Sequence, residues 1–247
     1  MSKSNILSVI DRLKTSYVIV VMVSIVTISL LLPKTIQSVM HIIRIRPLDN
    51  KIIVIDPGHG GIDGGTNIGE ILEKDINLSI ALKLKDLLSK KGATVIMTRD
   101  IDVSLDDHII GNGSRHREDL AARVKIIDES KADIFISIHV NHIKNVKRLG
   151  PIVFYDTNNN VQKYLAEHMQ EYLNDILTYK NIGVTVNHLA TAADYYILRN
   201  SIIPGIIVEM GFISNETDRK LLLEEEHQNE IVEQITKSLI KYFHDMR

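Results

Sequence analysis

The sequence predicts a single α/β domain in three layers, with a largely parallel, twisted sheet covered by helices on both faces and a hydrophobic anchor helix before it. Three observations support this fold class. Short apolar runs rich in β-branched residues recur along the chain, and they do not alternate with polar residues. Amphipathic stretches with helical spacing separate these runs. The length of 247 residues suits one domain with an extension and is short for two.

The predicted strands are the apolar runs, each bounded by polar or turn-forming residues. They cover residues 52–55, 94–97, 134–138, 152–155 and 205–208. A strand with one solvated face would show alternating polarity, so these continuous runs indicate burial on both faces.

The predicted helices are segments whose apolar residues recur every three or four positions. They cover residues 75–91, 118–130, 161–177 and 229–243. The first of them places Ile76, Ile80 and Leu84 on one face and stops at Gly92. The polar stretch 101–117 is predicted to be a surface loop.

The N-terminal region has the pattern of a membrane anchor. Residues 17–32 carry no charge and follow a basic leader at 1–16. No small-residue cleavage site follows, which favours an uncleaved signal anchor over a cleaved signal peptide; a buried core helix is the other alternative. Residues 33–50 are then a stalk, and residues 51–247 are the folded domain, placed outside the membrane.

Composition restricts the possible functions. The net charge of −2 shows no sign of a nucleic-acid-binding protein. The chain has no cysteine, which excludes disulfides and thiolate metal sites, so any metal must be held by histidines and carboxylates. Aromatic residues make up only 5%, so extensive stacking on sugar rings is not expected.

Four residues with metal-binding or proton-transfer chemistry lie where the predicted strands end. His59, His139 and Glu209 each come just after a strand. Glu73 comes just before the helix 75–91, which starts at the same edge of the sheet. Ligands of open α/β sheets bind at the carboxyl ends of the strands, so we expect these four side chains to meet.

Two histidines and one glutamate are a common ligand set for catalytic zinc. A further carboxylate, here Glu209, is then needed as a general base. Each residue also has a simpler explanation, such as Glu73 interacting with the helix dipole or Glu209 pairing with an arginine. The glycine-rich stretch 58–65 could be a phosphate loop, but it lacks the corresponding motifs. The four residues together favour a metal site.

Several segments also match a known family in their order along the chain. They are Val54–Gly61 (VIDPGHGG), Glu73–Leu78 (EKDINL), Thr98-Arg99, Ser137–Asn141 (SIHVN) and Val208–Asn215 (VEMGFISN). Together they resemble the zinc-dependent N-acetylmuramoyl-L-alanine amidases of the Amidase_3 type, over about residues 51–243.

The resemblance implies roles for individual residues. The set consists of one Zn²⁺ bound by His59, Glu73 and His139, the catalytic base Glu209, and the substrate-contact candidates Asn141, Arg115 and Arg117. The cluster Arg115–Arg117 could contact a glycan, an acidic peptide or a protein partner, or it could be a solvated basic loop. Arg99 is expected to form a structural ion pair.

The segment Ser114–Leu120 (SRHREDL) and the N-terminal anchor narrow the resemblance to the germination-specific, CwlD-type amidases of endospore formers. That resemblance implies hydrolysis of the amide between muramic acid and L-alanine, as a first step toward muramic-δ-lactam in spore cortex peptidoglycan. It implies action outside the cytoplasm, in the forespore or cortex space. An activating protein partner is compatible with it. The alternatives are another zinc exopeptidase and a membrane-tethered peptidoglycan-binding protein without activity.

Overall fold

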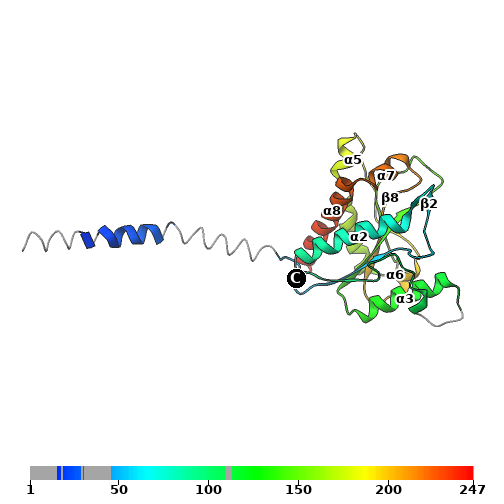
Figure 1. The fold of residues 1–247 in the computed structure, drawn as a ribbon, viewed down its shortest axis with the longest axis horizontal. Coiled ribbons are helices and arrows are strands. Elements are labelled where there is room, and N and C mark those ends of the chain that lie inside the picture. The colour runs from blue at the N-terminus through cyan, green and yellow to red at the C-terminus, as the bar shows by residue number, and fades with distance from the viewer. Residues whose placement is uncertain (1–15, 18, 29, 31–45, 109–112, 247) are drawn as a thin grey trace, which may run out of the picture. The chain divides into compact units, whose positions relative to one another are not determined.

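The computed structural model describes residues 16–17, 19–28, 30, 46–108 and 113–246. It divides into two units, residues 1–46 and residues 47–247, and the second unit contains the sheet (Figure 1).

In the first unit, the described residues from 16 to 30 are helical and exposed. Among the described residues, no helix is long and apolar enough to cross a membrane. Residues 1–15 of the predicted leader at 1–16 and most of the stalk at 33–50 lie outside the described residues, as does part of the predicted anchor at 17–32. The anchor therefore stays a prediction.

The second unit is built on a six-stranded sheet with the order β4-β1-β5-β8-β6-β7. Its strands are Ile52–Pro57 (β1), Thr94–Met97 (β4), Ile134–Asn141 (β5), Ile152–Tyr155 (β6), Thr191–Ala192 (β7) and Gly205–Phe212 (β8). A separate hairpin pairs Asn67–Ile68 (β2) with Ile71–Leu72 (β3). All neighbours in the main sheet are parallel except β6 and β8, which are antiparallel. The predicted, largely parallel sheet is confirmed.

Helices cover the sheet on both faces (Figure 1). They are Glu73–Lys90 (α2), Arg115–Glu129 (α3), Asn160–Leu173 (α4), Leu177–Asn181 (α5), Tyr196–Asn200 (α6), Glu216–Leu221 (α7) and Glu225–Asp245 (α8), with a 3-10 turn at Asp106–His108. Helices α2, α4 and α8 pack together over one face, and α3 packs with α6 over the other.

Two apolar clusters correspond to the two faces. Ile53 and Ile55 of β1 lie in the larger cluster, with α2, α4 and α8. Val54, between them, lies in the smaller cluster with Ile127 of α3 and Ile197 of α6. Successive side chains of a strand point to opposite faces, so the continuous apolar run of β1 fills both cores and confirms the three-layer prediction.

Strands β5 and β8 are longer than predicted, which changes the setting of two site residues. His139 and Glu209 lie within these strands and pair with each other in register. Between this pair and Asn141 the register shifts, so that Asn141 lies opposite Phe212. Bulges of this kind commonly adjoin active sites, because they re-aim side chains.

The predicted helix 161–177 is wrong at its C-terminal end. Helix α4 ends at Leu173, and a separate short helix, α5, begins at Leu177. The carboxylate of Glu230 on α8 accepts hydrogen bonds from the backbone N–H groups of Leu177 and Thr178. This contact satisfies the first N–H groups of α5, and it comes from a residue far along the chain.

The start of α3 also differs from the prediction. Ser114 caps the helix by accepting a hydrogen bond from the N–H of Arg117. Arg115–Arg117 therefore form the first turn of a helix, whereas the sequence placed them in a surface loop. A serine at this position commonly starts a helix.

Candidate active site

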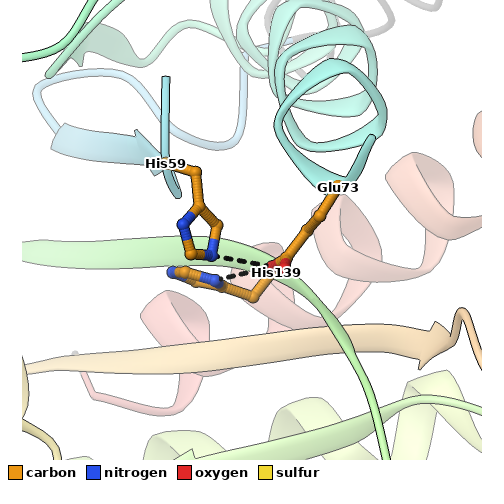
Figure 2. Close-up of side chains that lie close together, drawn as sticks. All are labelled: His59, Glu73 and His139. Carbon is orange, nitrogen blue, oxygen red and sulfur yellow. Dashed lines mark hydrogen bonds and ion pairs between the residues drawn. The ribbon is translucent and has the colours of Figure 1, made fainter. Parts of the chain in front are cut away.

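One cavity, of about 380 Å³, contains all four of the residues that the sequence singled out at the strand ends. His59 follows β1, Glu73 is the first residue of α2, and His139 and Glu209 lie in β5 and β8. Figure 2 shows His59, Glu73 and His139 pointing toward one another from a loop, a helix and a strand. The prediction that the four side chains meet at one edge of the sheet is confirmed.

The side chains of His59, Glu73 and His139 are arranged as metal ligands. Glu73 Oε1 lies 3.2 Å from His59 Nε2 and 3.0 Å from His139 Nδ1. One ligand atom from each residue falls within a common span of 4.8 Å. Ligand atoms of a tetrahedral zinc site, each about 2.1 Å from the metal, are about 3.4 Å apart. The three residues therefore fit a metal ion.

The electrostatics of these three residues also favour a cation. Burial alone would raise the pKa of Glu73, but hydrogen bonds and charge from His139 and His59 outweigh it and lower that pKa. Burial alone would lower the pKa of His59, but Glu73 and Asp63 raise it to about 9. A carboxylate that keeps its negative charge while buried stabilises positive charge beside it, whether that charge is a proton or a metal ion.

His59 is held in place through its other ring nitrogen. Its Nδ1 lies 2.8 Å from Asp63 Oδ2, a contact that orients the ring and leaves Nε2 free to face Glu73. A carboxylate behind a histidine ligand is common in metal sites. The backbone of His59 is left-handed, with φ of 60°, which is uncommon for a residue other than glycine. The sequence interpretation missed Asp63.

Two buried arginines hold the loop that carries His59. Arg123 of α3 donates to the backbone oxygens of Pro57 and His59, at 2.8 and 2.7 Å. Arg99 donates to the oxygens of Pro57 and Gly58, at 3.0 and 2.9 Å. Arg99 is thus structural, as expected, but its described hydrogen bonds go to backbone carbonyls and not to a carboxylate.

The charge of Arg123 is balanced inside the protein. Its guanidinium lies 2.7 Å from Asp56 Oδ1 and 2.6 Å from Asp119 Oδ2. Asp56 also accepts hydrogen bonds from Ser137 and Thr98, both at 2.6 Å. A buried ion pair needs such additional hydrogen bonds to offset desolvation. This network ties β1, β5 and α3 together beneath the site.

Two glycines leave room for the ligands. A side chain at Gly58 would place its Cβ only 2.1 Å from a ring carbon of His139. At Gly65, where φ is +66°, a Cβ would lie 2.7 Å from both Glu73 and His59. The glycines of this loop therefore permit close approach of the backbone to the ligand side chains.

Replacing Gly58 with alanine should displace the His139 ring and weaken metal binding. The backbone at Gly58 does not have a positive φ, so alanine causes no backbone strain there. Overpacking of this kind costs about 1–3 kcal/mol, and we expect a lower melting temperature together with a lower metal content. Elemental analysis and thermal unfolding of the purified protein would measure both.

Gly64→Ala is the matched control, because a Cβ there meets only Leu72, at an ordinary distance of 3.6 Å. The control should keep its metal. Equal metal content in Gly58→Ala and Gly64→Ala would contradict the role assigned to Gly58.

Glu209 lies beside the three ligand candidates but forms no ion pair with them. Its residue is only 8% exposed, and among the described residues its Oε2 has no hydrogen-bond partner. Burial raises the pKa of Glu209 to about 7, although the charge of His139 acts to lower it. A carboxyl group with a pKa near neutrality can both accept and return a proton.

The three residues that the sequence suggested as substrate contacts lie in different places. Asn141 lines the active-site cavity and Arg115 lines a neighbouring cavity, whereas Arg117 lines neither of these two. The active-site cavity also includes His116 and Tyr195, which sequence reasoning did not assign to it. Tyr195 precedes the five-residue helix α6, and this region had no detectable periodicity.

Comparison with known proteins agrees with this geometry. Residues 53–241 match the Amidase_3 family, described as N-acetylmuramoyl-L-alanine amidase. The germination-specific N-acetylmuramoyl-L-alanine amidase of Bacillus subtilis is 39% identical over 199 residues, which cover 80% of this chain and 81% of that protein. A probable cell wall amidase, LytH, of Staphylococcus saprophyticus is 35% identical over 80% of this chain but only 60% of its own length.

Solved structures show the same fold. The CwlD amidase from Clostridioides difficile, in complex with the GerS lipoprotein, superposes with a TM-score of 0.72 at 37% identity, covering 79% of this chain and 100% of that one. An N-acetylmuramoyl-L-alanine amidase from Clostridium difficile 630 has a TM-score of 0.66 at 30% identity, covering 80% and 98%. This chain therefore belongs to the Amidase_3 family and is an N-acetylmuramoyl-L-alanine amidase, an enzyme that acts on peptidoglycan.

Proposed function

We propose that the chain is a zinc enzyme that removes stem peptides from spore cortex peptidoglycan, with His59, Glu73 and His139 as ligands and Glu209 as the base. The observation that carries the proposal is the convergence of three ligand atoms within 4.8 Å beside a buried carboxylate oxygen with no described partner. We propose zinc as the metal because two histidines and one glutamate, with no cysteine, are a common ligand set for catalytic zinc.

The protein's own residues supply the proton transfers of amide hydrolysis. When bound, the metal would polarise the scissile carbonyl and make water a better nucleophile. Glu209 Oε2 takes a proton from the attacking water and returns it to the departing alanine nitrogen. Asn141, at the end of β5, lines the same cavity and would contact the substrate.

The proposed role in spore cortex is based on similar proteins. The similar protein from Bacillus subtilis is named as germination-specific, and the similar structure from Clostridioides difficile is a complex with a lipoprotein. We infer that this chain likewise acts outside the cytoplasm, on cortex, and assembles with a protein partner. In this proposal residues 1–16 are the leader, 17–32 the membrane anchor, 33–50 the stalk and 51–247 the catalytic domain.

Complementation would test the cortex role. The full chain, expressed in Bacillus subtilis that lacks its own germination-specific amidase, should restore muramic-δ-lactam to the cortex, measured by mass spectrometry of digested spores. A Glu209→Gln chain should not restore it. Intact cortex without lactam in the presence of well-expressed wild-type chain would contradict the cortex role. Release of stem peptide from vegetative wall alone would then favour a general cell wall amidase.

A further inference from the structure

A second cavity adjoins the active site and has a different chemical character. Its volume is about 310 Å³, and its lining consists of Ile62, Asp63, Ser104, Arg115, His116 and Asp119. It shares Asp63, His116 and Asp119 with the active-site cavity, so the two cavities adjoin each other. Since Asp63 holds the ring of His59, the second cavity begins one side chain away from the ligand set shown in Figure 2.

The two carboxylates of the second cavity already have partners. Asp63 binds His59 Nδ1 at 2.8 Å. Asp119 binds Arg123 at 2.6 Å and accepts a hydrogen bond from the backbone N–H of Leu105 at 2.9 Å. Their negative charge is therefore largely committed within the protein.

The guanidinium of Arg115 is in the opposite situation. It is exposed, and it makes no hydrogen bond or ion pair with any residue that the structure describes. A cation in the first turn of a helix interacts unfavourably with the helix dipole, so the charge of Arg115 does not stabilise α3. Arg115 thus presents free donors in a cavity that leads to the catalytic groups.

The chemistry of the substrate indicates what such a cavity would bind. The scissile amide joins a sugar to a peptide, and the two sides differ in charge. The glycan side offers neutral hydroxyl and acetamido groups, whereas the stem peptide carries free carboxylates. A guanidinium binds a carboxylate through paired, charge-assisted hydrogen bonds. The cavity has no tyrosine or phenylalanine in its lining on which a sugar ring could stack.

We propose that the second cavity is a subsite for the stem peptide, in which Arg115 binds a carboxylate on the second residue of that peptide. This proposal rests on the amidase function. It also gives the direction of the bound substrate, because the peptide would run from the ligand set along the start of α3. Arg117, in the same turn but outside both cavities, has no part in it.

Steady-state kinetics on a pair of muropeptides would test the subsite. The two substrates differ only in the second stem residue, which carries either a free carboxylate or the corresponding carboxamide. For the acidic substrate, Arg115→Gln should raise KM about fivefold, the size expected of one exposed ion pair, with kcat nearly unchanged. For the amidated substrate the same variant should behave like the wild type.

Two further variants separate a specific contact from a general charge effect. Lys125→Gln removes an exposed charge from the same helix at a position that lines neither cavity, and should change neither KM. Arg117→Gln should affect the acidic substrate much less than Arg115→Gln. Equal effects of Arg115→Gln and Arg117→Gln, or equal effects on the two substrates, would overturn the subsite. If the wild type cleaved neither substrate, the amidase function itself would fail, which is a different result.

Discussion

Glu209→Gln is expected to reduce the turnover of muropeptides by about 10²–10⁴-fold, the contribution typical of a general acid–base group. Glutamine has nearly the same shape but cannot accept the proton of the attacking water. Because Glu209 forms no described hydrogen bond through Oε2, the substitution breaks no described contact of that atom, and the fold should remain intact. It also removes the cost of burying a charge, so the melting temperature should hold or rise. Metal content should stay at the wild-type level.

Glu129→Gln is the matched control, since it removes an exposed carboxylate at the end of α3 and should leave turnover unchanged. A Glu209→Gln protein with wild-type turnover and a full complement of metal would contradict the role of Glu209. A variant that lost its metal would show instead that Glu209 belongs to the ligand set.

The second large effect is expected for His139→Ala. Removing Nδ1 leaves Glu73 Oε1 without its partner at 3.0 Å and leaves two ligands of three. Changes that affect only the outer partners of a metal site cost 10–100-fold in affinity, so loss of a ligand should exceed that range. Isothermal titration of the metal-free protein with zinc would measure it. Turnover at micromolar zinc should fall with the affinity.

Asp63→Asn provides a graded comparison, because Asp63 orients His59 without being one of the proposed ligands, and its replacement should cost 10–100-fold in zinc affinity. His108→Ala, which removes an exposed histidine outside the described cavities, should have no effect. If His139→Ala bound zinc as tightly as His108→Ala, the ligand set would be wrong.

The sequence alone predicted the layers of the fold and the four central residues of the site, for physical reasons that are local. Apolar runs such as that of β1 mark strands buried on both faces, and the ends of parallel strands bring distant residues to one edge. His59, Glu73, His139 and Glu209 could therefore be placed before any contact was known.

The features that the sequence did not reveal depend on contacts between distant segments. Helix α5 begins as a separate helix where Glu230, on another helix, accepts hydrogen bonds from its first N–H groups. The ion pair between Arg123 and Asp56 joins positions 67 residues apart. No periodic pattern around either residue predicts this contact. Arg115 and Arg117 look equivalent in the sequence, and only the packing of α3 against the loop after β1 places one of them in a cavity.

Mass spectrometry of purified muropeptides, incubated with the full chain before and after metal removal, would test the central claim most directly. Untreated enzyme should release intact stem peptides with a free L-alanine amino terminus. Enzyme stripped by a chelator should release none, and added zinc should restore the activity in the wild type but not in Glu209→Gln. Release of the same peptides by metal-free enzyme, or cleavage within the stem peptide instead of before L-alanine, would contradict the account.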